Sequence, residues 1–230
     1  MVLMKFVKLL HEGLVALFIL INGMMLHLFL LHFPYGLEPF FISLVNWNKL
    51  SPQIGYVVTI TLMVMVVVVA LVWRLGTEWK NRILYMRMNY PHPAFNAFLT
   101  NRRQPFETSA LVQAFPKVKD SGFNPQVQIE TWNALHKQHA DMPVVMNTRI
   151  HWHILRDLYL LALVFLGVFL VGWVVNFRVP FQIVSAYLFL FGAQFLFLLL
   201  MARKVGYRLV DNVLGVALGM DDSKQKDKKR

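Results

Sequence analysis

Long apolar stretches without charge dominate the pattern of hydrophobic and polar positions along this chain. Four stretches of at least 20 residues contain no Asp, Glu, Lys or Arg: 13–37, 50–73, 158–177 and 179–202. An α-helix needs about 20 apolar residues to cross a hydrocarbon core of about 30 Å. The pattern therefore predicts four membrane-spanning helices, at residues 13–33, 54–73, 158–176 and 181–202.

The segments around these spans complete a predicted all-α membrane fold with a small helical cytoplasmic domain between spans two and three. Its parts are an N-terminal helical hairpin (1–73), the cytoplasmic domain (74–157), a C-terminal helical hairpin (158–202), a juxtamembrane helix (203–220) and a disordered basic tail (221–230). Apolar residues recur at helical spacing in segment 37–48, which predicts an amphipathic helix on the outer membrane surface. No small-residue cleavage site follows the first apolar run, so we expect a retained span and not a signal peptide.

Prolines and polar residues punctuate the segment that follows span two. We expect the helix of that span to continue through Arg82, and Pro91 with Pro93 to break it. Further on, Asn124 and Pro125 have the residue types of a helix N-cap and first position, which predicts a helix from 125 to about 139. That helix would place Ile129 and Trp132 near one face, together with Leu135 or His136.

The positive charge of the chain is concentrated in some of its segments. The net charge is +11, and 21 of the 23 Lys and Arg residues lie before the first span, in 74–156 or after residue 202. Only Lys49 and Arg178 lie in the two opposite connections. By the positive-inside rule, we expect both termini and the large loop to face the cytoplasm. Anionic lipid headgroups on that side account for this charge, so we expect no nucleic-acid partner.

Few residues have the pattern of a catalytic or metal site. The sequence has no cysteine, which excludes disulfides, thiolate metal sites and iron–sulfur clusters. His136 and His139 are three residues apart, but a zinc site needs a third or fourth ligand and none completes a known spacing. Nucleophile and phosphate-loop motifs are absent. We therefore expect a non-enzymatic protein without metal or cofactor, and a membrane-bound metalloenzyme is the rival hypothesis for these histidines.

Aromatic and basic side chains in the cytoplasmic segment are candidates for binding a partner protein, because Trp and Arg often anchor such interfaces. The candidate residues are Tyr90, His92, Phe95, Arg102, Arg103, Trp132, His136 and His139. The competing interpretation is that the phenylalanines of this segment form the core of the small domain.

Uncharged polar and small residues in span four allow a second function. Gln182, Ser185, Gly192 and Gln194 are candidates for close helix packing, within one subunit or between subunits of a homo-oligomer. If the protein oligomerises, Gln182 and Gln194 could instead line a polar pore. The alternative hypothesis is thus an oligomeric channel-like or membrane-disrupting effector of an anti-phage defence system.

Several segments together carry a resemblance to a known family. They are Tyr90-Pro91-His92-Pro93-Ala94-Phe95-Asn96-Ala97-Phe98, Pro125-x-Val127-Gln128-x-x-x-Trp132-x-x-Leu135, Arg156-Asp157 and Gly206-x-Arg208-x-Val210-x-Asn212-Val213-Leu214. In these segments the chain resembles small four-span bacterial proteins that include entry exclusion, or surface exclusion, proteins of conjugative plasmids. The resemblance implies a non-catalytic protein of the recipient's inner membrane. It would block uptake of a related conjugative element by recognising a component of the donor's transfer apparatus.

Overall fold

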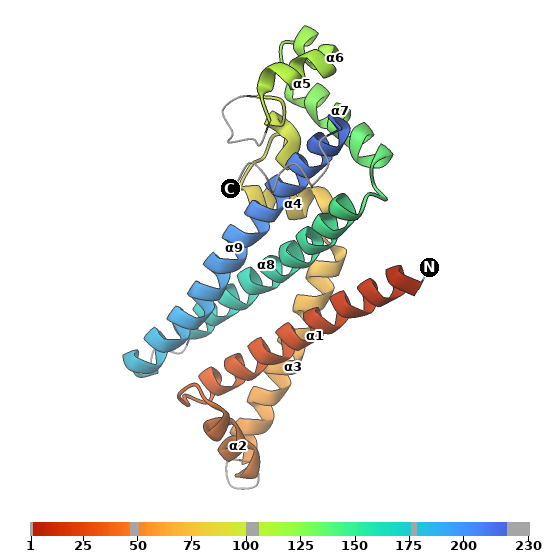
Figure 1. The fold of residues 1–230 in the computed structure, drawn as a ribbon. Helices are drawn as coiled ribbons and strands as arrows, with labels where there is room; N and C mark the ends of the chain where they lie inside the picture. The colour runs from red at the N-terminus through yellow and green to blue at the C-terminus, as the bar shows by residue number, and fades with distance from the viewer. Residues whose placement is uncertain (1, 47–50, 100–105, 176–178, 220–230) are drawn as a thin grey trace, which may run out of the picture. The chain divides into compact units, whose positions relative to one another are not determined.

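The computed structural model describes residues 2–46, 51–99, 106–175 and 179–219, and its regular structure in these ranges is helical, without a β-strand (Figure 1). Four helices are long and apolar enough to cross a membrane: α1 (Val2–Leu30), α3 (Ser51–Arg74), α8 (Pro143–Val175) and α9 (Phe181–Ala217). The predicted all-α class with four candidate spans is therefore confirmed. By the length and composition of these helices, the chain is a multi-pass membrane protein.

The chain divides into two compact units. The first unit contains residues 1–76 and 156–199, and the second contains residues 77–155 and 200–230. Helices α8 and α9 each contribute residues to both units. The predicted juxtamembrane helix at 203–220 is the continuation of α9 through Ala217, and it belongs to the second unit. The predicted tail at 221–230 lies outside the described residues.

Aromatic side chains from three helices form the core of the first unit. Phe29 of α1 meets Phe169 of α8 edge-to-face, with ring centroids 4.7 Å apart, and Tyr187 of α9 at 5.5 Å. Phe169 also packs against Phe191, and all four rings are buried. The Tyr187 hydroxyl donates to the Phe33 carbonyl oxygen at 3.1 Å, which satisfies the polar end of this ring.

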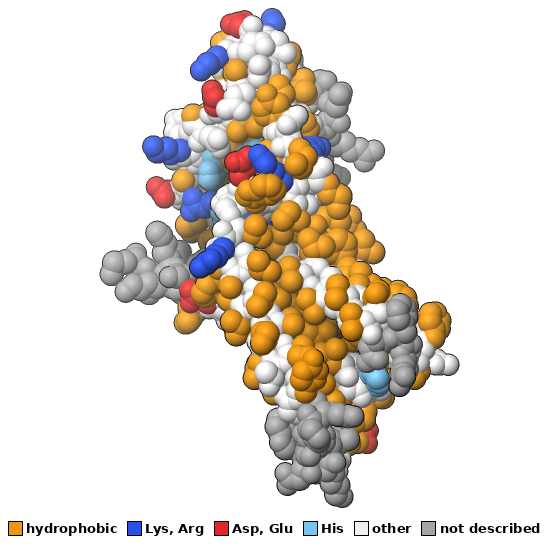
Figure 2. All heavy atoms as spheres, turned by 180° about the vertical axis from the view of Figure 1, so that it is seen from behind, with side chains coloured by type: hydrophobic (Ala, Val, Ile, Leu, Met, Phe, Trp, Pro, Cys, Tyr) orange, Lys and Arg blue, Asp and Glu red, His pale blue; other side chains and the backbone are white. Residues whose placement is uncertain are grey.

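Much of the remaining surface of the first unit is apolar and exposed. On α3 the exposed side chains include Leu62, Met63 and Val66, and Trp73 near its end is 71% exposed. In Figure 2, hydrophobic side chains cover the surface of the span helices, whereas charged side chains gather over the second unit. A water-soluble protein rarely leaves so much contiguous apolar surface uncovered, and lipid is the solvent that suits it.

A short helix follows the first span. Helix α2 covers Leu37–Val45, within the predicted segment 37–48, whose last two residues lie outside the described ranges. Its Phe40 ring meets the buried His27 ring of α1 at 6.3 Å, and Phe41 and Val45 are exposed. The location of α2 on the outer membrane surface stays a prediction.

The second unit begins with a break in the helical backbone that the sequence pattern did not predict. Helix α3 ends at Arg74, and after Leu75 and Gly76 a separate helix α4 covers Thr77–Tyr85. The expected continuous helix through Arg82 was wrong. Gly76 explains the break, because glycine inside a helix costs about 1 kcal/mol relative to alanine, and the apolar run that favours the span ends there.

Short helices and one longer helix build the rest of this unit. They are the 3₁₀ turn η1 (Pro93–Asn96), α5 (Thr108–Ala114), α6 (Pro116–Asp120) and α7 (Pro125–Gln138). Helix α7 confirms the predicted start: the Asn124 side chain accepts a hydrogen bond from the Gln126 N–H at 2.9 Å, and Pro125 is the first helical residue.

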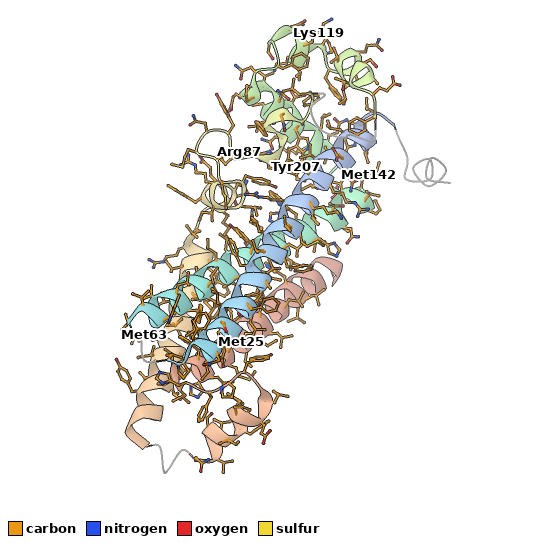
Figure 3. The ribbon with its side chains drawn as sticks, turned by 90° about the vertical axis from the view of Figure 1, so that its left-hand side faces the viewer. Met25, Met63, Arg87, Lys119, Met142 and Tyr207 are labelled. Atoms are coloured by element: carbon orange, nitrogen blue, oxygen red, sulfur yellow. The ribbon has the colours of Figure 1, made fainter. Side chains whose placement is uncertain are left out.

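A close approach at Gly206 joins three helices of the second unit. A Cβ atom at this position of α9 would overlap the Tyr85 hydroxyl of α4 and lie 2.8 Å from the Trp152 indole nitrogen of α8. Beside it, Tyr207 (labelled in Figure 3) meets Tyr85 edge-to-face at 5.7 Å, and the Arg203 Nε–H donates to the Leu84 carbonyl at 2.7 Å. Glycine is thus required here for packing.

Gly206→Ala should destabilise the protein by about 1–3 kcal/mol, because the added methyl group overpacks the contact with Tyr85 and Trp152. The matched control is Gly215→Ala on the same helix, where a Cβ meets nothing within 4 Å. That change should be neutral or stabilise by up to about 1 kcal/mol through helix propensity. Thermal unfolding of both variants in detergent measures the difference, and equal stabilities would contradict the assigned contact.

Candidate functional site

A cleft of about 730 Å³ lies in the second unit, between α4, the segment that follows it and the start of α7. Its size is in the range of pockets that hold small molecules or the side chains of a partner. The lining residues combine ionised, amide, aromatic and apolar groups: Thr77, Glu78, Asn81, Arg82, Met88, Asn89, Tyr90, Pro91, His92, Gln126 and Ile129.

Helix α4 supplies the charged wall of the cleft. Glu78 and Arg82 are one helical turn apart, and an Arg82 Nη2–H donates to Glu78 Oε1 at 2.6 Å. The guanidinium also lies over the Trp79 ring, 4.8 Å from its centroid, a distance typical of a cation–π contact. Its buried Nε has no hydrogen-bond partner, so the donors of Arg82 are not saturated by the protein.

The segment after α4 supplies a residue in a strained conformation. Tyr90 has φ of 50°, in the left-handed region, and its side chain is 42% exposed. For a bulky residue this conformation costs on the order of 1–3 kcal/mol and persists only where its surroundings impose it. Such strain is concentrated at functional sites, and here it holds an aromatic ring at the edge of the cleft.

Three rings pack in series next to this segment, and we call them the ring stack: His92 is tilted by 52° to Trp132, and Trp132 is stacked on His136. The His92 ring lies 4.9 Å from Trp132 of α7, and the other neighbour of Trp132 is His136, 4.8 Å away and nearly parallel. His92 caps η1, because its Nδ1 accepts a hydrogen bond from the Ala94 N–H at 3.1 Å. This bond requires an unprotonated Nδ1 and places the ring proton of neutral His92 on Nε2.

Both histidines of this stack are held in the neutral form. Burial, and as a smaller cause the charge that His136 would carry, lower the pKa of His92 from 6.5 to about 4. Burial is also the main cause that lowers the pKa of His136, with Arg149 as the second cause. At neutral pH the stack therefore contributes aromatic packing and no positive charge.

A buried amide fixes the segment of residues 90–98 on α7. Gln128 is fully buried, and its Oε1 accepts from the Phe98 N–H at 3.1 Å while its Nε2–H donates to the Phe123 carbonyl at 2.7 Å. Phe98 packs edge-to-face on Phe115, with ring centroids 5.5 Å apart. The competing interpretation of the phenylalanines as core residues thus applies to Phe98, which is 1% exposed.

The structure brings four of the eight predicted binding residues together. Tyr90 and His92 line the cleft, and Trp132 and His136 stack behind His92. Phe95 lies apart from them under the Arg87 guanidinium, 3.9 Å from its ring centroid. His139 is the C-cap of α7, where its N–H donates to the Leu135 carbonyl. The two remaining residues, Arg102 and Arg103, lie outside the described ranges.

Sequence analysis missed the charged and amide groups of the cleft, among them Glu78, Asn81, Arg82 and Gln126. The spacing of Glu78 and Arg82 was an available signal, since an i,i+4 acid–base pair marks an exposed helix face. No comparable pattern connects α4 with the start of α7, which is remote in sequence.

The four residues singled out in span four lie on α9. Gln182 and Ser185 are exposed, and the Ser185 hydroxyl donates to the carbonyl of Gln182 in its own helix at 3.0 Å. A Cβ at Gly192 would meet nothing within 4 Å. The Gln194 Oε1 atom is buried without a partner in the described structure. Close packing of this face against another subunit and a pore both stay predictions.

Among the described residues, no three His, Asp or Glu side chains gather as metal ligands would. The His136 ring is committed to Trp132, and His139 closes a helix. The arrangement at the cleft is suited to binding: a salt bridge, amide groups and an aromatic edge offer hydrogen bonds and packing to a ligand.

The low pKa of His92 predicts that the folded protein loses stability as the pH is lowered. The unfolded chain binds a proton near pH 6.5 that folded His92 resists until about pH 4, so the folded state loses on the order of 3 kcal/mol between these values. His136 and Arg149 are the titratable and charged groups that act on this stack. His92→Asn keeps an N-cap acceptor and removes the titration, so its stability should depend less on pH.

Thermal unfolding of wild type and His92→Asn in detergent, at about pH 7 and at about pH 4.5, makes the comparison. All other titrating groups are common to the two proteins. Parallel losses of stability in both would contradict a buried neutral His92.

Comparison of this chain with protein-family models, with curated proteins and with solved structures returns no match. Function is therefore argued from the geometry of the second unit and the membrane character of the first.

Proposed function

We propose that this chain is a non-enzymatic recognition protein of the bacterial inner membrane, and that it acts in surface exclusion of conjugative elements. The second unit faces the cytoplasm and binds a protein partner, a component of the transfer apparatus, with Tyr90 at the contact. The observation that carries this proposal is the exposed ring of Tyr90, held at the cleft edge in a left-handed backbone conformation. A strained exposed aromatic contributes nothing to a core, and it is the type of residue that anchors interfaces.

Three of the four segments that resemble exclusion proteins lie in the second unit, which supports this proposal, and Arg156-Asp157 lies in the first unit. Residues 90–98 pack on α7, where Pro93, Ala94 and Phe98 are buried, and Gly206 packs on Tyr85 and Trp152. The burial of these residues indicates that the resembling segments are needed for packing within the second unit. Tyr90 is the clearly exposed member of the segment, so the partner contact is assigned to it.

The proposed orientation is testable because the sequence contains no cysteine, so one substitution supplies the sole thiol. Lys119→Cys on α6 and Glu38→Cys on α2 are both exposed positions. In intact cells with a permeable outer membrane, a membrane-impermeant maleimide should label Glu38→Cys, and should label Lys119→Cys only after lysis. Labelling of Lys119→Cys in intact cells would reverse the topology.

Recipient cells that express the protein should receive a related conjugative plasmid at reduced frequency, measured by mating with donors that carry a panel of plasmids. Tyr90→Asn should lose about tenfold or more of this exclusion, because it removes an interface anchor worth about 1.4 kcal/mol or more. Asparagine tolerates the left-handed conformation, so the fold should persist. Met142→Ala is the matched control: Met142 is an exposed apolar residue of the same unit outside the cleft lining.

Two outcomes contradict the proposal. Exclusion of no plasmid in the panel would remove surface exclusion as the function, and equal exclusion by Tyr90→Asn and wild type would remove Tyr90 as the contact. A membrane-potential dye in the same recipients distinguishes surface exclusion from the rival hypothesis. A channel-like or membrane-disrupting effector depolarises the cells, whereas an exclusion protein leaves the potential intact.

A further inference from the structure

The cleft in the second unit is lined by charged and amide groups that the proposed partner contact at Tyr90 does not involve. Glu78 and Arg82 present one negative and one positive group side by side, joined at 2.6 Å. His92, the histidine of the lining, is neutral at pH 7 because its pKa is about 4. The ionised side chains of the lining therefore sum to zero charge, which favours a ligand with both charges over a simple anion.

The donors and acceptors of the cleft are arranged around that pair. Arg82 directs one of its five N–H groups to Glu78, and its side chain is 28% exposed, so this guanidinium has N–H groups left for a phosphate. The Glu78 side chain is 66% exposed, which leaves its carboxylate open to an ammonium group. Asn89 and Gln126 add amide groups nearby, and Met88, Pro91 and Ile129 form an apolar wall.

The lining of the cleft begins a short way along the chain from a candidate span. Thr77, one of the lining residues, follows Arg74, the last residue of that span, by three positions. Three residues reach at most about 10 Å. The exposed Trp79 and Tyr90 are residue types that suit the boundary between headgroups and acyl chains, and Met86 and Met88 are exposed apolar residues beside them in the sequence.

We infer that the cleft bounded by Glu78, Arg82, Asn89 and Gln126 binds the headgroup of a zwitterionic phospholipid with a primary ammonium, of the phosphatidylethanolamine class. The phosphodiester oxygens accept hydrogen bonds from Arg82, and the ammonium donates to Glu78 and to amide oxygens. A quaternary ammonium has no N–H to donate, so a choline headgroup fits less well. An anionic glycerol headgroup brings no ammonium group to Glu78 and adds uncompensated negative charge to the lining. This inference rests on the cleft alone and does not require the protein partner proposed above.

The test uses the full chain, reconstituted in vesicles with equal mole fractions of phosphatidylethanolamine, phosphatidylcholine and phosphatidylglycerol. The protein is then released in mild detergent, and the retained lipids are counted by native mass spectrometry. Wild type should retain the ethanolamine lipid about tenfold over each of the others, the effect of one hydrogen bond to a charged group.

Two opposite charge changes make the test specific. Arg82→Gln should lose the retained ethanolamine lipid by about tenfold, because the phosphate loses its cation. Glu78→Gln should gain phosphatidylglycerol at the expense of the ethanolamine lipid, because the lining then has a net positive charge. Arg74→Gln, at the end of the span and outside the lining, removes an interfacial cation and should leave the preference for ethanolamine over choline unchanged.

Thermal unfolding of each variant, compared with wild type, shows whether it is folded. If Arg82→Gln does not fold, the change of preference in Glu78→Gln decides alone. Equal retention of the three lipids by wild type, or the same preference in Glu78→Gln and wild type, would overturn the inference. Soluble glycerophosphoethanolamine that binds as tightly as the vesicle lipid would overturn the membrane as the source of the headgroup.

Discussion

The structure depends on the absence of hydrogen-bonding solvent in the hydrocarbon core. Each backbone N–H and C=O in a span must find its partner inside the chain, which four uninterrupted helices provide. Several polar donors in the spans obey the same constraint: the hydroxyls of Thr59 and Thr61 and the Nδ2–H of Asn22 donate to carbonyls four residues earlier in their own helices. The amide oxygens of Asn22 and Gln194 are the exceptions, since both are buried without a hydrogen-bond partner in the described structure.

Residues with irregular backbone conformation lie just after the ends of helices, where the following N–H group still finds a carbonyl partner in the preceding turn. Helix α1 ends with His32 at φ of 61°, and the Phe33 N–H closes the turn on the Leu28 carbonyl. The same type of ending occurs at Met86 after α4, where the Arg87 N–H reaches the Arg82 carbonyl. Both are left-handed residues other than glycine, and both come after the helix has finished. Strain is thus tolerated at helix ends and excluded from the spans.

Features set by local chemistry were predictable from the sequence. The spans follow from uncharged length, and the start of α7 follows from Asn124 and Pro125, because these signals act within a few residues. The break at Gly76 was missed because a single glycine was outweighed by the helical character on both sides. The cleft was missed for a different reason. It joins Arg82 to Gln126, and it depends on the conformation of Tyr90, which tertiary contacts impose on a residue that disfavours it.

One buried side chain of the second unit, Gln128, tolerates few amino-acid substitutions. Gln128 accepts a hydrogen bond from the Phe98 N–H and donates one to the Phe123 carbonyl, so its two terminal atoms have opposite roles. An ionised glutamate has the same shape and could still accept from Phe98, yet it would set a carboxylate oxygen against the Phe123 carbonyl, and lysine or methionine would each supply at most one of the two functions. A swap of a single NH₂ for oxygen would therefore replace one of the two hydrogen bonds with a repulsion between oxygen atoms.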